Sequence, residues 1–256
     1  MNKNNLKERL MTGKQAIGVW NTISSPVVTD VLASTGVDFV FIDFEHGPFD
    51  LKNILSYTNA CLSYGVTPIV RIPRAEEWMV QQALDQGAQG IIAPHIETLD
   101  QANNFSNSLR FYPQGNRGFT PYSKAGNYTA ESIENFITSS NEGVLSFAIV
   151  ESLEGLNNIE DISSCENLDA IFFGSFDISQ SMGMPGMTRD PAVVQKIGEA
   201  NKIAKENGKY TGGYLLNSEN DIDWVKQFNF NFLIYGVDSF LLKNTLTAAV
   251  SYFRGR

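Results

Sequence analysis

The 256-residue sequence has few of the residues that build disulfide-rich, nucleic-acid-binding or membrane-spanning proteins. Its two cysteines, Cys61 and Cys165, show the spacing of neither a disulfide framework nor a metal site, so we expect reduced thiols and a cytoplasmic location. Nineteen Lys and Arg stand against 28 Asp and Glu, and this net charge of −9 disfavours a nucleic-acid partner. The sequence has neither an apolar run of membrane-spanning length nor the apolar core of a secretion signal, so we also expect no membrane partner.

Short apolar and β-branched runs alternate with longer segments of helical period from the first twenty residues to the last twenty. Nearly all of these runs are apolar rather than alternating, as expected of parallel strands that are covered on both faces. We predict eight strands, at residues 16–21, 38–44, 68–72, 90–96, 144–150, 170–174, 211–216 and 231–235. Helices are predicted between and after them, at residues 27–35, 51–64, 77–86, 99–109, 130–139, 155–164, 191–207, 219–228 and 239–253. Three of these helices begin at residues with N-cap chemistry, Asp50, Asp190 and Ser218.

Eight strand–helix units in a chain of this length predict a (β/α)₈ TIM barrel, a single α/β domain over residues 1–256. An open doubly wound sheet is disfavoured because no Gly-rich phosphate-binding motif follows the first strand. Two longer polar stretches, 110–129 and 175–190, interrupt the alternation, and loops of this length in a compact domain are usually functional.

Polar side chains gather where the predicted strands end. Because a TIM barrel carries its active site at the carboxyl ends of its strands, we expect these residues to converge on one rim. They come from the second, third, fifth and sixth strands: Asp43, Glu45, His46, Arg71, Glu151 and Asp177.

Glu151 and Asp177 follow neighbouring strands, where two carboxylates can share a hard divalent cation and leave positions for water and substrate oxygens. The alternative is that each acid is a helix cap or a surface charge. His46 is one of only two histidines and has the chemistry of a base near pH 7, or else it is a structural histidine. His95, the other histidine, also follows a strand, but no orienting acid is evident beside it in the sequence.

Arg71 ends the third strand, where its guanidinium suits a carboxylate or a developing oxyanion; the alternative is a salt bridge to Glu45 or Asp43. Asp85 ends a predicted helix, where its negative charge opposes the helix dipole, so another interaction is expected to require it.

The chain resembles the HpcH/HpaI aldolases, metal-dependent class II pyruvate aldolases built on a (β/α)₈ barrel. The resemblance spans nearly the whole chain and is carried by ordered motifs: Gly18-Val-Trp20, Asp43-Phe-Glu45-His46-Gly47-Pro48, Val70-Arg71, Leu84-Asp85-Gln-Gly87, Tyr112-Pro113-Gln-Gly115-Asn-Arg117-Gly118, Val150-Glu151 and Gly174-Ser-Phe-Asp177.

The resemblance implies a role for each matching position. Glu151 and Asp177 would hold the divalent metal ion (Mg²⁺, Mn²⁺ or Co²⁺), and Arg71 would neutralise an enolate oxygen. His46 would be the catalytic base, paired with Asp85 across a subunit boundary. Asp43 and Glu45 would support these groups. The remaining positions, which would bind substrate, are Trp20, Gly174, Ser175, Phe176 and Leu215.

The implied activity is cleavage or formation of a 4-hydroxy-2-oxo acid, to or from pyruvate and an aldehyde. No lysine ends a strand in this set, so a Schiff-base aldolase lacks its nucleophile. The chain departs from the family at Ile149, where a glutamine is usual, and at Phe176, where an alanine is usual. These departures leave three alternatives open: an oxaloacetate decarboxylase, a malyl- or citryl-type acyl-CoA lyase, or a barrel that binds small molecules with altered catalysis. The family also implies a homo-oligomer, a trimer or a hexamer, with a C-terminal helix that can be exchanged between subunits.

Overall fold

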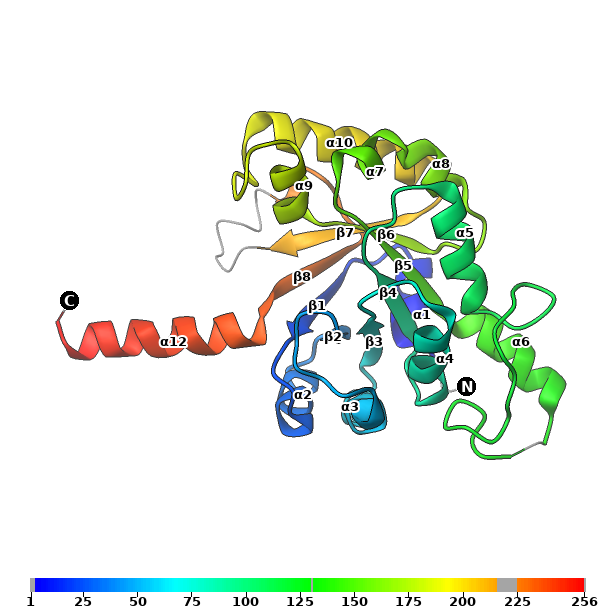
Figure 1. Cartoon of the computed structure of the whole chain (residues 1–256). Coiled ribbons are helices and arrows are strands. Elements are labelled where there is room, and N and C mark those ends of the chain that lie inside the picture. The colour runs from blue at the N-terminus through cyan, green and yellow to red at the C-terminus, as the bar shows by residue number, and fades with distance from the viewer. Residues whose placement is uncertain (1–2, 130, 216–224, 256) are drawn as a thin grey trace.

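Eight parallel strands close into a barrel in chain order, β1 to β8, with β8 pairing back to β1 (Figure 1). The structure is a computed structural model, and it describes residues 3–129, 131–215 and 225–255. The strands are β1 Ala16–Asn21, β2 Phe39–Asp43, β3 Thr67–Arg71, β4 Gly90–Ala93, β5 Leu145–Val150, β6 Ala170–Phe173, β7 Tyr210–Leu215 and β8 Phe232–Val237. The predicted (β/α)₈ barrel is therefore confirmed, and every predicted strand overlaps an observed one.

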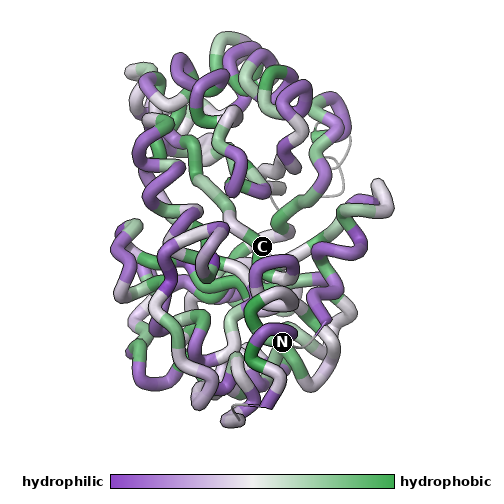
Figure 2. Tube along the Cα trace, turned by 90° about the vertical axis from the view of Figure 1, so that its right-hand side faces the viewer, coloured by the Kyte–Doolittle hydropathy of each residue, from purple (hydrophilic) through white to green (hydrophobic). Residues whose placement is uncertain are grey.

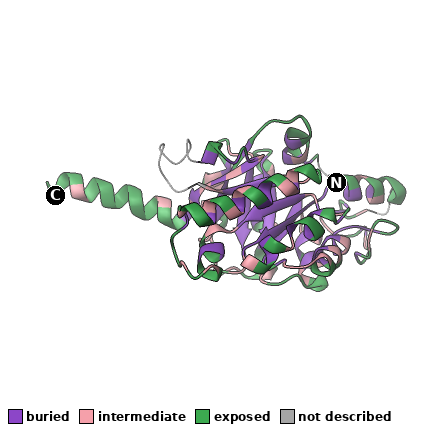
Figure 3. Cartoon of the chain, turned by 90° about the horizontal axis from the view of Figure 1, so that it is seen from above, coloured by how far each residue is buried: buried purple, intermediate pink, exposed green. Residues whose placement is uncertain are grey.

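Helices surround this barrel, while its strands form the buried centre (Figure 3). They are α2 Pro26–Ala33, η1 Leu51–Asn53, α3 Ile54–Ser63, α4 Glu77–Asp85, α5 Leu99–Ser108, α6 Ile133–Gly143, α7 Leu153–Asn157, α8 Ile159–Ser164, α9 Ser175–Ser181 and α10 Pro191–Glu206. A last helix, α12 Asp238–Phe253, follows β8. Hydrophilic and hydrophobic residues alternate along these outer segments (Figure 2), as expected of helices that cover a sheet with one face. Asp50 and Asp190 accept hydrogen bonds as predicted N-caps, whereas Ser218 and most of the predicted helix 219–228 lie outside the described residues.

The inside of the barrel is packed with aromatic rings from several strands. Phe41 contacts Phe147 edge to face at 5.7 Å between ring centroids, and Phe147 contacts Phe232 in the same way at 5.3 Å. Gly212 makes room for this packing, because a Cβ atom there would collide with the Phe232 ring. The filled interior is a rigid support for side chains at the rim.

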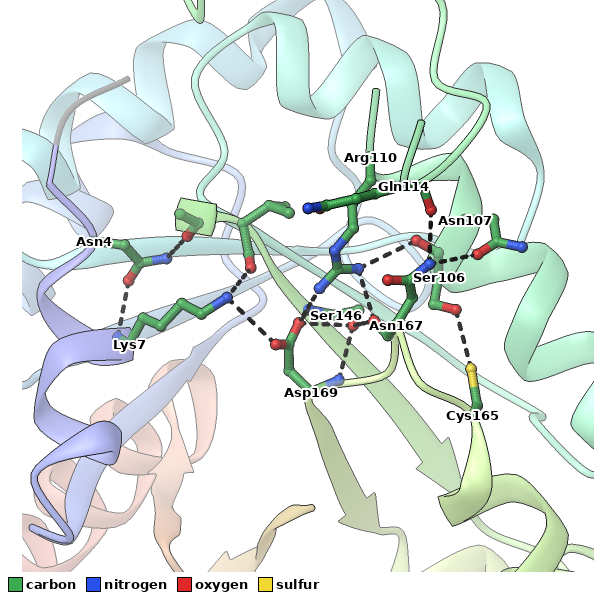
Figure 4. A network of polar contacts seen from close by, with 12 residues as sticks. Asn4, Lys7, Ser106, Asn107, Arg110, Gln114, Ser146, Cys165, Asn167 and Asp169 are labelled. Atoms are coloured by element: carbon green, nitrogen blue, oxygen red, sulfur yellow. Dashed lines mark hydrogen bonds and ion pairs between the residues drawn. The ribbon is translucent and has the colours of Figure 1, made fainter. Parts of the chain in front are cut away.

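A short N-terminal helix, α1 (Asn5–Met11), closes the barrel at the amino ends of its strands, and the sequence patterns did not predict it. Leu6 and Leu10 of this helix are buried in the same cluster as the barrel aromatics. Figure 4 shows the polar contacts at this end: Asp169 accepts hydrogen bonds from Arg110 at 2.8 Å and from the Ser146 hydroxyl at 2.9 Å, and Lys7 approaches it at 3.4 Å. The network ties α1 to the barrel, away from the carboxyl ends of the strands.

Two further differences from the prediction concern helices. The predicted helix 155–164 is interrupted at Asn158, which caps α8, so that α7 and α8 are separate. A short helix, α9, occupies the start of a segment predicted to be a loop, where burial of Ile178 anchors it.

The last helix, α12, extends away from the barrel and is exposed over most of its length (Figures 1 and 3). Its departure is fixed by Asp238, whose buried carboxylate accepts hydrogen bonds from Asn21 at 2.7 Å, from the Thr22 hydroxyl at 2.7 Å and from the backbone of Ile23 at 2.9 Å. Among the described residues, no helix combines the length and the apolar character that crossing a bilayer requires.

Candidate active site

A cavity of about 260 Å³ opens at the carboxyl ends of the barrel strands. It receives side chains from strands that are far apart in the sequence, in agreement with the expected convergence on one rim. Its lining residues are Trp20, Thr22, Asp43, His46, Arg71, Ile149, Glu151, Phe172, Gly174, Ser175, Phe176, Asp177, Tyr214 and Val237.

Asp43, at the end of β2, organises one side of the cavity. Its buried carboxylate receives two hydrogen bonds from the Arg71 guanidinium, at 2.9 and 2.6 Å, and one from the Trp20 indole at 2.8 Å. The backbone N–H groups of Glu45 and His46 donate to it as well, each at 3.0 Å. Burial by itself would raise the pKa of Asp43. Hydrogen bonds from Arg71, from the His46 backbone and from Trp20, together with the positive charge of Arg71, outweigh this effect and hold the pKa below 3.8.

Arg71, at the end of β3, is held from three sides. Besides its bidentate bond to Asp43, it lies 3.0 Å from a carboxylate oxygen of Glu45, and its guanidinium carbon stacks 4.6 Å from the Trp20 ring centre. The salt bridges considered from the sequence are thus both present. They do not remove Arg71 from the cavity, which it still lines. A guanidinium fixed in this way is a preorganised donor for developing negative charge.

Glu151 and Asp177 line the same cavity. Glu151 directly follows β5 and is buried, and Asp177 is exposed in the first turn of α9. Gly174 separates β6 from α9, and a Cβ atom there would lie 2.8 Å from Cβ of Glu151, so only glycine lets the two segments approach so closely. Burial raises the pKa of Glu151, and the negative charges of Asp177 and Glu45 raise it further. The hydrogen bond from the His95 backbone and the charge of His95 act in the opposite direction but do not cancel the rise.

His95 stands beside Glu151, a pairing that the sequence order did not reveal. Its backbone N–H donates to Oε1 of Glu151 at 2.9 Å, and its ring Nδ1 lies 2.9 Å from the same oxygen. The residue has a φ of 56°, in the left-handed region, which turns the backbone N–H toward the carboxylate.

His46 lines the cavity from the turn after β2. Asp43 fixes the backbone of that turn, while the His46 ring is exposed and has no hydrogen-bond partner in the part of the chain that the structure describes. The ring is therefore available to a ligand in the cavity.

Asp85 is not brought to this cavity within the chain. It ends α4, which leads into the amino end of β4, so it lies toward the opposite end of the barrel from the cavity. Its carboxylate accepts a hydrogen bond from Arg117 at 2.7 Å, and Arg117 is buried and stacks 4.5 Å from the centre of the Phe111 ring. This ion pair accounts for an acid at the carboxyl end of a helix. Pairing of Asp85 with His46 across a subunit boundary stays a prediction.

Aromatic side chains of α9 and β7 form part of the cavity wall. Phe176 is half exposed, and its ring meets that of Tyr214 at 6.3 Å with steeply inclined planes. Ser175 begins α9 at the cavity edge, and Leu215 is the last residue of β7, with a side chain outside the described part of the structure. Sequence reasoning missed four lining residues at or next to the carboxyl ends of β1, β6, β7 and β8, although these places were a usable signal: Thr22, Phe172, Tyr214 and Val237.

The donor set fits a divalent cation. Glu151 and Asp177 offer two carboxylates to one cavity. Burial, with a smaller contribution from the charges of Asp177 and Glu45, raises the pKa of Glu151, so a cation bound there would favour its ionised form. Within the described residues, no group of three or more His, Cys, Asp or Glu side chains is arranged around one point. A cation held by these two carboxylates would therefore keep most of its coordination positions for water and substrate oxygens.

Comparisons with known proteins agree with the barrel fold. Residues 16–245 match the family model described as HpcH/HpaI aldolase/citrate lyase. The chain is 30% identical to a hydroxypyruvate/pyruvate aldolase of Pseudomonas aeruginosa, over 98% of this chain and 93% of that protein. It is 29% identical to a 2-keto-3-deoxy-L-rhamnonate aldolase of Shigella boydii, with the same coverage. The crystal structure of the citrate synthase SbnG superposes with a TM-score of 0.89 at 29% identity, over 99% of this chain and 98% of that one.

Proposed function

The chain belongs to the HpcH/HpaI aldolase/citrate lyase family and is a carbon–carbon lyase of the class II aldolase type, and on this premise we propose that it cleaves a 4-hydroxy-2-oxo acid to pyruvate and an aldehyde, and catalyses the reverse addition. The observation that carries the proposal is the joint lining of one cavity by two carboxylates, a fixed guanidinium and an unpaired imidazole, those of Glu151, Asp177, Arg71 and His46.

A divalent metal ion, which we propose is held by Glu151 and Asp177, supplies positive charge beside the 2-oxo group when bound. Mg²⁺, Mn²⁺ and Co²⁺ all accept such oxygen ligands. The N–H groups of Ser175 and Phe176 open α9 and have no partner within that helix, so they are suited to the substrate carboxylate.

Arg71 stabilises the negative charge that develops during cleavage. Its guanidinium is fixed by Asp43, Glu45 and Trp20, so it need not reorganise as charge appears on the carbonyl oxygen. His46 takes the proton of the 4-hydroxyl group, the bond between C3 and C4 breaks, and the electron pair passes to C3. The aldehyde leaves, and the His46 proton is returned to C3 to complete pyruvate.

The aldehyde end of the substrate is expected to meet Trp20, Phe176 and Tyr214, which line the same cavity. These rings favour an aldehyde with an apolar portion, since apolar surface gains most from burial against aromatic side chains.

We also propose that the protein is a cytoplasmic homo-oligomer, a trimer or a hexamer, with α12 packed on another subunit. The helix carries exposed apolar side chains along its length: Phe240, Leu242, Leu246, Val250, Tyr252 and Phe253. A surface of this kind is typical of a protein contact. Light scattering after size-exclusion chromatography tests it, and a monomer at micromolar concentration contradicts it.

The experiment for the activity incubates the purified protein with pyruvate, Mn²⁺ and a panel of aldehydes, and identifies products by mass. The proposal expects a product of pyruvate plus aldehyde that requires the metal and is lost in Glu151→Gln. Parallel assays with oxaloacetate and with malyl-CoA distinguish a decarboxylase and a thioester lyase. Binding of pyruvate and Mn²⁺ without turnover on any substrate identifies a non-catalytic binding barrel.

A further inference from the structure

His95 makes two contacts with one oxygen of Glu151. The backbone N–H of His95 donates to Oε1 at 2.9 Å, and ring atom Nδ1 lies 2.9 Å from Oε1. The other ring nitrogen, Nε2, is 3.9 Å from a carboxylate oxygen of Glu45, and the ring is otherwise open to solvent, with a side-chain exposure of 68%.

These contacts leave the two oxygens of Glu151 in different situations. Oε1 is occupied by the two nitrogen atoms of His95, whereas Oε2 faces Gly174, where an added Cβ would lie 3.2 Å from it. Gly174 is the residue before α9, the helix that carries Asp177 in its first turn. The oxygen that His95 does not use therefore lies beside the start of the segment that carries Asp177.

The backbone at His95 serves the same arrangement. With φ at 56°, residue 95 is in the left-handed region that few side chains other than Gly, Asn, Asp and His adopt readily. This conformation lets one residue present both its N–H and its side chain to the same carboxylate. Without the ring, Glu151 keeps one neutral donor, and its carboxylate can rotate about the last side-chain bond.

We propose that His95 is a positioning residue that fixes the Glu151 carboxylate, with Oε1 bound to His95 and Oε2 free to bind the divalent cation. The inference rests on the proposed function, because it takes Glu151 as a metal ligand. An ionised carboxylate only accepts hydrogen bonds, so Nδ1 acts as the donor. Partners that orient metal ligands in this way affect metal affinity although they do not touch the metal.

The test measures binding of Mn²⁺ alone to the purified full-length protein by titration calorimetry. The second measurement is the rate of aldol addition of pyruvate as a function of the Mn²⁺ concentration. His95→Gly keeps the left-handed backbone and its N–H but removes the ring, and His95→Asn keeps both the conformation and a side-chain donor. Glu151→Gln serves as the control that removes the ligand charge. Melting temperatures in EDTA check that each variant is folded, and His95→Ser replaces His95→Gly should that variant unfold.

We expect His95→Gly to weaken Mn²⁺ binding by about tenfold to a hundredfold. His95→Asn is expected to restore most of the affinity. We expect kcat at saturating Mn²⁺ to change less than the Mn²⁺ concentration needed for half-maximal activity, because His95 acts through the metal ligand. A merely structural role would lower the melting temperature and leave the affinity of the folded fraction unchanged.

Two results overturn the inference alone: wild-type affinity in His95→Gly while Glu151→Gln has lost binding, or equal weakening in His95→Gly and His95→Asn. Failure of the proposed function gives a different pattern. If the wild-type protein binds no Mn²⁺, or Glu151→Gln binds it equally well, the metal assignment and the role of His95 are both overturned.

Discussion

Replacing Asp43 by asparagine tests whether one carboxylate organises the cavity. Asp43 is 1% exposed and Arg71 is 8% exposed, so the pair is screened little by solvent. The substitution keeps the shape of the side chain but removes its charge. All the groups that contact the Asp43 carboxylate are hydrogen-bond donors, the N–H groups of Arg71, Trp20, Glu45 and His46. The NH₂ group of asparagine would face these donors without an acceptor.

The size of the effect follows from the charge left behind. Removing one partner of a buried ion pair costs about 3–5 kcal/mol of the free energy of unfolding. Glu45 remains 3.0 Å from Arg71 and compensates part of its charge, so we expect the lower end of that range. For a chain of this size, each kcal/mol corresponds to about 2–4 °C, so a loss of about 3 kcal/mol lowers the melting temperature by about 6–12 °C.

The assay is calorimetric or circular-dichroism melting at pH 7 in EDTA, with Glu8→Gln as the matched control. Glu8 pairs with Lys3 at 2.7 Å on the surface, where both side chains are at least half exposed. Such pairs contribute about 0–1 kcal/mol. A double-mutant cycle of Asp43→Asn with Arg71→Met isolates the pair, and we expect a coupling of at least about 1 kcal/mol. Additive effects, or a loss no larger than in Glu8→Gln, would refute the reasoning.

The dependence of this loss on pH has a definite sign. The pKa of Asp43 lies below 3.8 in the folded protein, so the stability that its charge contributes is complete above that pH. It is lost as the pH falls through the lower, folded-state pKa. The difference between wild type and Asp43→Asn should therefore be constant over about pH 5–8 and shrink only in stronger acid.

The remaining predictions concern the metal ligand, the base of the barrel, the cavity wall and the last helix. Because burial and neighbouring charge raise the pKa of Glu151 above 4.5, its ionised form destabilises the metal-free fold. Glu151→Gln should therefore raise the melting temperature in EDTA at pH 7, and this gain should vanish below about pH 4.5, where Glu151 is protonated. The variant should also lose the rise in melting temperature that Mn²⁺ causes in the wild type. Asp169→Asn leaves the buried Arg110 without its charged partner and should cost about 3 kcal/mol of stability while kcat is unchanged. Phe176→Ala should widen the range of aldehydes accepted, measured as kcat/KM across the panel, and equal loss for all aldehydes would contradict a role in selection. Deleting residues 240–256 should reduce the molar mass found by light scattering to that of a smaller assembly, and an unchanged mass would exclude α12 from the interface.

The barrel was predictable because its signals are local. Eight apolar runs mark the strands, and polar residues directly after them mark the rim, so Asp43, Arg71 and Glu151 could be assigned to one site from their strand ends alone. The helices α1 and α9 escaped because each has only seven residues, too few for a periodic pattern. Such short helices are stabilised by tertiary burial, of Leu6 and Leu10 in one case and Ile178 in the other.

Side-chain partners were less predictable than strand ends. His95 lies 56 positions before Glu151, and its contact depends on the pairing of β4 with β5 and on a left-handed backbone that the sequence did not indicate. Asp85 was recognised as an unfavourable charge at a helix end, but its partner Arg117 comes from a loop whose path no periodicity specifies. Local patterns identify which residues reach the rim, while their mutual contacts depend on the closed barrel.

The carboxylate of Asp238 determines more than the start of one helix. As the first residue of α12, directly after β8, Asp238 binds Asn21 at the end of β1 and Thr22 and Ile23 just after that strand, so these hydrogen bonds hold the junction between the barrel and α12. The direction of α12 is thus set when a single chain folds. A second molecule that binds α12 therefore meets a helix whose orientation is already fixed, and little conformational entropy is lost on association.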